Sequence, residues 1–214
     1  MRRGVFYSLL VLLTSFIMGC SDDEYVYPPA LTELLSVRTN ASGTIDYLLP
    51  DRSAGLRVEN GSKYSGMVPD SIYRLVAIYE IKDAKEPSAY IYTIGNVIAP
   101  EPIGQEQLAG EMKTDPVNIQ SIWRSGDYLN MILLVKAQNK KHSFHFIEAQ
   151  GANQTSCLRL TLYHDKGEDV EAYTQKAYLS VPLKKYSGIF SEGDPILFTI
   201  NLYKEGLRTY QFTF

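Results

Sequence analysis

The chain has 214 residues, of which 45% are hydrophobic and 21% charged, and its formal net charge is −3 at pH 7. This composition is typical of one large folded domain or two small ones, and it excludes a disordered chain and a protein with several membrane spans. The chain is acidic overall, so it lacks the excess of basic residues that is typical of a nucleic-acid-binding protein. Tyrosine is abundant, with 16 Tyr against 8 Phe and 1 Trp, which suits half-buried strands.

The first twenty residues have the pattern of a lipoprotein export signal. Arg2 and Arg3 precede an apolar run over 5–18, which ends at Gly19 and Cys20. A run of that length indicates a secretory signal rather than a membrane span. We expect residues 1–19 to be cleaved off and Cys20 to carry lipid on its sulfur and its amine, which predicts an outer-membrane lipoprotein. An ordinary signal peptide with a chance cysteine is the alternative.

Residues 20–30 are expected to tether the folded part to the lipid. Ser21-Asp22-Asp23-Glu24 follows the cysteine, and Tyr27-Pro28-Pro29 ends the segment. Acidic residues in this place resemble the export signal of surface lipoproteins in some Gram-negative bacteria, so we expect display on the cell surface, with the periplasmic face as the alternative. Removing residues 1–19 changes the formal charge from −3 to −5. Cys157 is the only other cysteine, which excludes an intramolecular disulfide in the mature domains.

Apolar and polar residues alternate from residue 31 onward, as they do in half-buried strands. The first block holds expected strands near 33–40, 43–49, 55–60, 73–82 and 88–98. Five short strands in this length predict a small closed barrel, because closure removes exposed edges. We assign the barrel domain to residues 31–112.

A stretch rich in proline and glycine, 99–117, separates the two blocks, and we place the domain boundary at 112–117. In the second block, 118–214, a strand, a Gly126-Asp127 turn and a long strand come first. Further alternation follows at 158–163, 177–183 and 196–203. Six or seven such strands predict an antiparallel β-sandwich, and the whole chain is expected to be all-β.

Residues that could carry chemistry are few. His142 and His145 have the spacing H-x-x-H, but on a strand the two side chains point to opposite faces, which is poor geometry for a metal. His164 with Asp165 could join a site only through a tertiary contact. The chain also lacks the G-x-S-x-G, P-loop and dinucleotide motifs. We therefore expect no catalytic residue, no metal and no cofactor, and a protein that is not an enzyme.

Aromatic side chains are the candidate ligand contacts, because exposed rings stack on sugars and peptides. The candidates are Trp123, Tyr73, Tyr79, Tyr90 and Tyr92. For the tyrosines the favoured interpretation is that they cover the barrel wall. For Trp123 it is packing at the domain junction or in the sandwich core, with a role as ligand anchor as the alternative. Negative charge argues against a nucleic acid as partner.

The mature chain resembles the NigD-like lipoproteins. The segments that carry the resemblance are 126–130, 169–173 with 176–183, and 207–212. The resemblance implies an OB-like five-stranded barrel followed by a β-sandwich, a place in the cell envelope and an association with bacteriocin immunity, but no functional residues.

We expect a non-catalytic binding module anchored to the membrane by its lipid, with a protein or a glycan as ligand. Capture of glycans or peptides for a nutrient-uptake system is the second hypothesis, and a hydrolase is the third. The sequence leaves the oligomeric state open.

Overall fold

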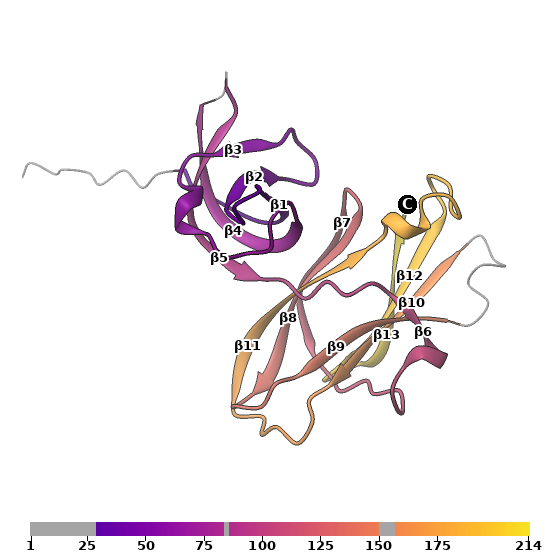
Figure 1. Ribbon diagram of the computed structural model, residues 1–214. Coiled ribbons are helices and arrows are strands. Elements are labelled where there is room, and N and C mark those ends of the chain that lie inside the picture. Colours follow the sequence, from indigo (N-terminus) through magenta and orange to yellow (C-terminus); the bar gives the residue numbers. More distant parts are fainter. Residues whose placement is uncertain (1–28, 84–85, 150–156) are drawn as a thin grey trace, which may run out of the picture.

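The computed structural model describes residues 29–83, 86–149 and 157–214, and it is built from strands and short 3₁₀ turns. Figure 1 shows a small barrel in the N-terminal colours above a larger body of two sheets. The expected signal peptide, Cys20 and the acidic tether up to residue 28 lie outside the described residues. Among the residues that are described, no helix has the length and apolar character needed to cross a membrane.

The barrel closes in the strand order β1-β2-β3-β5-β4, with β4 pairing back on β1. Its core is formed by side chains that alternate inward along these strands, as the period-two pattern predicted. Leu35, Leu48 and Ile91 are 0–1% exposed there. The strands are β1 (Leu31–Thr39), β2 (Ile45–Leu49), β3 (Leu56–Val58), β4 (Ile72–Asp83) and β5 (Ser88–Asn96), with the 3₁₀ turn η2 (Gly61–Lys63) between β3 and β4.

The second body is a sandwich of a five-stranded sheet, ordered β13-β12-β10-β9-β6, and a three-stranded sheet, ordered β11-β8-β7. Met131, Phe146 and Phe198 are fully buried between the two sheets. The strands are β6 (Ile103–Gly104), β7 (Asn118–Ser125), β8 (Tyr128–Ala137), β9 (Ser143–Glu148), β10 (Leu158–Asp165), β11 (Tyr173–Pro182), β12 (Pro195–Leu202) and β13 (Gly206–Thr213), with 3₁₀ turns η3 (Gln105–Gln107) and η5 (Lys184–Tyr186).

The all-β class with a barrel followed by a sandwich is confirmed, but the sandwich is not wholly antiparallel. Strand β10 pairs parallel with β12, and β6 pairs parallel with β9. Alternation in a sequence indicates a strand with one buried face and does not distinguish the direction of its partner. The five-stranded sheet is therefore mixed.

The domain boundary lies earlier than the expected 112–117. Ile98 already pairs with Leu179, β6 joins the five-stranded sheet, Thr114 pairs with His164, and Val117 is a fully buried member of the sandwich core. The stretch 98–117 thus belongs to the sandwich. Prolines and glycines exclude long regular strands there, but they leave the backbone free to make isolated pairs with neighbouring strands.

Candidate functional site

A buried arginine joins the barrel to the sandwich. Arg74 on β4 is 9% exposed, and its guanidinium donates to both carboxylate oxygens of Asp51 at 2.6 and 2.8 Å. It also donates to Asn130 Oδ1 on β8 at 2.8 Å and to Ser180 Oγ on β11 at 3.1 Å. The planar fork of arginine matches such a set of acceptors, so its buried charge is fully paired.

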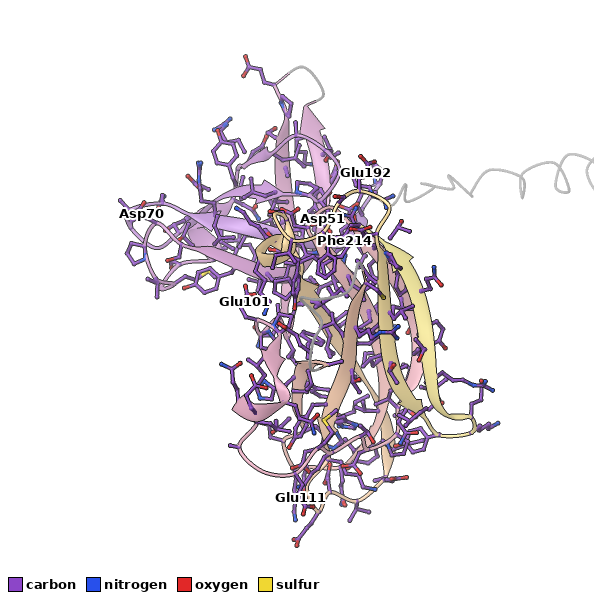
Figure 2. The ribbon with its side chains drawn as sticks, turned by 90° about the vertical axis from the view of Figure 1, so that its right-hand side faces the viewer. Asp51, Asp70, Glu101, Glu111, Glu192 and Phe214 are labelled. Atoms are coloured by element: carbon purple, nitrogen blue, oxygen red, sulfur yellow. The ribbon has the colours of Figure 1, made fainter. Side chains whose placement is uncertain are left out.

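Further contacts around this ion pair fix how the two domains meet. The Arg74 guanidinium carbon lies 3.8 Å from the centre of the Tyr128 ring, a cation–π contact. Arg52 donates to the backbone carbonyl of Arg124 at 2.8 Å. Figure 2 shows Asp51 where the barrel meets the sandwich, between Asp70 at the tip of the barrel and Glu111 at the far end of the sandwich. The charged network therefore holds the two domains in one arrangement.

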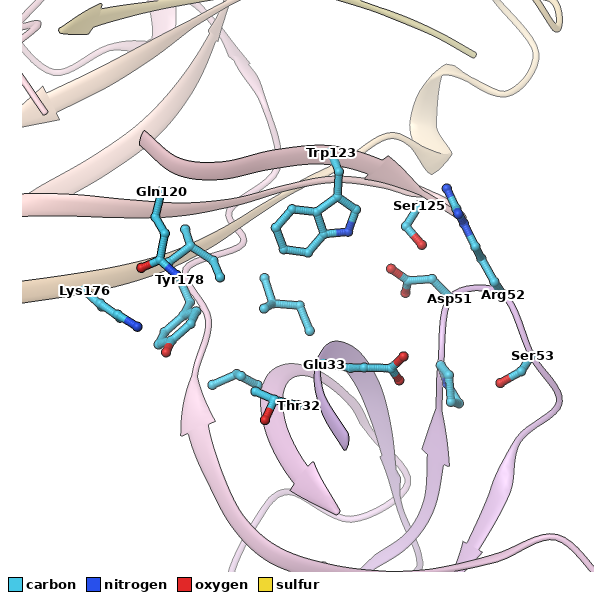
Figure 3. A pocket seen from close by; sticks show the side chains of 14 residues that line it. Thr32, Glu33, Asp51, Arg52, Ser53, Gln120, Trp123, Ser125, Lys176 and Tyr178 are labelled. Atoms are coloured by element: carbon cyan, nitrogen blue, oxygen red, sulfur yellow. The ribbon is translucent and has the colours of Figure 1, made fainter. Parts of the chain in front are cut away.

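Beside this junction lies a groove of about 490 Å³, within the usual size range of ligand sites. Strand β1, the segment 50–53 and strand β4 form its barrel wall. The opposite wall is the outer face of the three-stranded sheet, which contributes Gln120, Trp123, Ser125, Ile132, Lys176 and Tyr178. Figure 3 shows these side chains around the open space, with the indole ring of Trp123 facing it.

Strand register explains why Trp123 faces the groove. Trp123 pairs with Asn130, which pairs with Ser180, and residues paired across neighbouring strands point to the same face. Leu129 and Met131, on either side of Asn130, are fully buried in the sandwich core. Asn130 and Trp123 must therefore point outward, toward the barrel.

Trp123 lies at the domain junction, as one of the two structural interpretations expected, and it is not a member of the sandwich core. Its side chain is half-buried. An aromatic ring that is half-buried in an open groove can still contact a ligand. The structure thus retains Trp123 as a candidate contact.

The charged side chains of the groove differ in whether they already have an ion-pair or hydrogen-bond partner. Asp51 is neutralised by Arg74. Glu33 accepts one hydrogen bond, from the Tyr79 hydroxyl at 2.7 Å, and burial together with this contact raises the pKa of Tyr79 well above its usual value. The side chain of Lys176 forms no ion pair or hydrogen bond with any residue that the structure describes. Arg52, also in the lining, donates to the backbone carbonyl of Arg124 and forms no ion pair with a described residue. A ligand would therefore meet two cations without an ion pair, Arg52 and Lys176, and one carboxylate with a free oxygen.

The four tyrosines do not share this groove. Tyr79 is 2% exposed inside the barrel, which leaves no ring face for a ligand. Tyr73 is half-buried against the barrel core, and its hydroxyl accepts the Val68 N–H at 2.9 Å. Tyr90 and Tyr92 lie together on β5, with ring centres 5.4 Å apart, and Tyr92 is 42% exposed. The latter two form a separate aromatic surface on the barrel.

The two histidines of the H-x-x-H spacing also separate. His145 packs its ring near Tyr163, whereas the ring of His142 contacts His164. No group of three or more His, Cys, Asp or Glu suited to a metal occurs among the described residues. The sequence did not reveal the Arg74 network or the part of Lys176 in the groove, because both depend on contacts between segments far apart in the chain.

The strand order of the barrel is that of an OB fold, so the architecture defines an OB-type barrel followed by a β-sandwich. Residues 99–214 match the family model of the NigD-like C-terminal beta sandwich domain. A crystal structure of a NigD-like immunity protein from Bacteroides caccae is 32% identical, covers 88% of this chain and 94% of its own, and has a TM-score of 0.71. The chain belongs to the NigD-like family.

A more distant likeness supports the fold alone. The crystal structure of a protein of unknown function from Bacteroides vulgatus is 16% identical, covers 86% of this chain and 91% of its own, and has a TM-score of 0.68. A comparison with curated proteins found no match.

Proposed function

We propose that this protein is a lipid-anchored cell-envelope protein that acts as a non-catalytic binding module, and that it holds a segment of another protein in the groove between barrel and sandwich. The observation that carries the proposal is the groove whose wall holds Trp123 and, further along the same sheet, Lys176, which forms no ion pair with a described residue. Tryptophan dominates the binding energy of many protein interfaces because it buries a large, rigid surface.

The buried junction favours tight binding in this groove. Because Arg74, Asp51 and Asn130 hold the two walls in place, little freedom is lost when a ligand binds. A preformed site spends less of its binding energy on ordering than a flexible one does. The walls are also mixed in character, with apolar Ile132 and Val76 beside polar Gln120 and Thr32, as expected of a site that fixes orientation.

A non-catalytic role is supported by the state of the two carboxylates in the groove. Asp51 is held by both nitrogens of the Arg74 fork, and Glu33 accepts the Tyr79 hydroxyl. Hydrolysis by a pair of carboxylates needs one acid that gives a proton and one base that takes it. An ion-paired Asp51 suits neither role.

The relative from Bacteroides caccae is named as an immunity protein, and we propose a role of that kind here, in which binding neutralises a protein toxin. A glycan is the second candidate ligand. Trp123 beside the amide of Gln120 and the carboxylate of Glu33 combines a stacking surface with planar polar groups, which also suits a sugar ring.

The lipid anchor is the part of the proposal that rests on Cys20. Replacing Cys20 with Ala removes the thiol that accepts the lipid, so the variant should incorporate no labelled fatty acid and should leave the membrane fraction. Metabolic labelling followed by fractionation measures both effects. A matched variant, Cys157→Ala, should keep its label, and labelling that persists in Cys20→Ala would contradict the anchor.

Binding in the groove is tested by truncating its tryptophan. Trp123→Ala should weaken retention of the bound protein by about 30-fold or more, because hot-spot truncations cost about 2 kcal/mol or more. The measurement is quantitative affinity purification of the tagged protein from envelope extracts. Tyr92→Ala, an exposed aromatic on the barrel, is the control and should retain the same protein as the wild type.

Three outcomes of this purification are informative. A protein lost from Trp123→Ala alone supports the proposal. Equal retention by both variants contradicts the groove as the site. Loss of a glycan instead of a protein from Trp123→Ala would support the second candidate.

A further inference from the structure

A buried cluster of titratable groups lies in the sandwich, apart from the groove. His142 precedes β9, His164 is on β10, and Asp169 is in the loop between β10 and β11. The ring atoms His142 Nδ1 and His164 Nε2 are 2.9 Å apart, and His142 Nε2 lies 3.4 Å from Asp169 Oδ2. The side chains of His142 and Asp169 are only 6% and 1% exposed.

Asp169 is an ionised carboxylate in the protein interior. It accepts the backbone N–H groups of Gln138 at 2.8 Å and of Asn139 and Lys140 at 3.2 Å. These hydrogen bonds hold the pKa of Asp169 far below its usual range. A buried carboxylate of this kind is costly without a counter-charge. The amine of Lys140 is directed to the exposed Glu168 instead, at 3.3 Å.

The two hydrogen bonds of the rings require two protons, and the approach of His142 to Asp169 favours a third. His164 Nδ1 lies 2.9 Å from the backbone carbonyl of Asp115, and a carbonyl can only accept, so this nitrogen carries a proton. The hydrogen bond between the rings needs one proton. His142 Nε2 faces the Asp169 carboxylate and has no hydrogen-bond partner, so a bare nitrogen there would set a lone pair against a negative oxygen.

Two neutral imidazoles carry only two ring protons. We infer that His142 and His164 together bind three protons in the folded protein, so that the pair carries one positive charge. This charge neutralises Asp169 and holds three loops of the sandwich together. The loops are the segment around Asp115, the turn 138–140 and the loop 165–171. In Figure 1 the turn between β8 and β9 and the loop between β10 and β11 lie at the end of the sandwich away from the barrel.

The charged groups around the pair agree with this assignment. Of the two rings, His142 is the one beside Asp169, with Nε2 3.4 Å from Oδ2, and this contact places the positive charge on His142. Burial is the main cause that lowers the pKa of His164. On the other side, Asp115 accepts the backbone N–H of Lys166 at 2.8 Å, and Asp165 is paired with Lys113 at 2.7 Å. The ring of His164 is stacked on Phe144 with centres 4.5 Å apart, so no further charge reaches that face.

If the two histidines hold three protons in the folded state, the free energy of unfolding decreases both when the pH is raised and when it is lowered. Above about pH 6.5 the unfolded histidines hold two protons between them, one fewer than the folded pair, so stability falls as pH rises. Below that pH the unfolded histidines hold four protons, one more than the folded pair, so stability falls as pH drops. The contribution of this pair to the stability of the folded protein is therefore largest near the ordinary pKa of histidine.

The direct test counts ring protons by NMR in the folded protein labelled with ¹⁵N histidine. At pH 7.5 we expect three of the four ring nitrogens of His142 and His164 to be protonated. His145, which lies outside the cluster, serves as the internal control. Two protonated nitrogens at pH 7.5 would overturn the inference.

Thermal unfolding between pH 6.5 and 8.5 gives a second readout. The Tm of the wild type should fall by about 3–5 °C per pH unit through this cluster, since one pKa unit is about 1.4 kcal/mol. His142→Gln should flatten this slope, and His145→Gln should leave it unchanged. Equal slopes in all three proteins would also overturn the inference.

Discussion

Replacing Asp51 with Ala is expected to lower the free energy of unfolding by about 3–5 kcal/mol, because it leaves the Arg74 guanidinium buried without its carboxylate. The side chains of this pair are only 5% and 7% exposed, and arginine cannot relieve the penalty by losing its proton. For a protein of this size the change corresponds to a loss of about 10 °C in Tm. Thermal or urea unfolding of the mature protein measures it.

The chain holds a matched control for this substitution. Arg38 and Asp46 form the same two-pronged ion pair, with hydrogen bonds of 3.1 and 2.8 Å, but their side chains are 46% and 28% exposed. Exposed pairs contribute about 1 kcal/mol or less, so Asp46→Ala should change the free energy of unfolding by no more than that. If the two variants lose equal stability, the Arg74 pair does not lock the junction.

Gly126→Ala is expected to destabilise the protein by about 2–3 kcal/mol, because two separate effects add at this turn. Gly126 has a φ of 52°, which costs a residue with a Cβ about 1–2 kcal/mol. A Cβ there would also lie 2.8 Å from the backbone oxygen of Asp51, so the barrel segment would have to move. Denaturant unfolding of the variant gives the size of the loss.

Gly167 separates the two effects. Its φ of 60° is similar, but a Cβ added there would meet no atom within 4 Å. Gly167→Ala should therefore cost only the backbone strain, about 1–2 kcal/mol. A Gly126→Ala variant no less stable than Gly167→Ala would show that the close approach of the turn to Asp51 is not part of the junction.

The fold could be predicted from the sequence because the strands of each domain show the alternation of apolar and polar residues that a half-buried strand requires. The alternation through Leu35 and Val37 in the barrel, and through Leu158, Leu160 and Leu162 in the sandwich, reflects one buried face per strand, and these residues are 0–2% exposed. The boundary was misplaced because the stretch 98–117 lacks that alternation. Its residues join the sandwich through isolated backbone pairs, which leave little trace in a sequence.

Only part of the candidate site could be predicted from the sequence. The short turn at Gly126-Asp127 fixes the register of its hairpin and sets Trp123 opposite Asn130, so the outward direction of Trp123 was contained in the sequence. The partners of Arg74 were not, since Asp51, Asn130 and Ser180 come from three separate segments. The same holds for His142, whose partner His164 is 22 residues away, on β10.

The groove as the binding site is tested most directly by a photo-cross-linking amino acid placed at position 123 in the lipidated protein, in living cells of the native bacterium. A second protein with the same group at position 92, on the exposed surface of the barrel, is the control. The account predicts a discrete cross-linked protein from position 123 that is missing from position 92. The same product from both positions, or a product from position 92 alone, would contradict it.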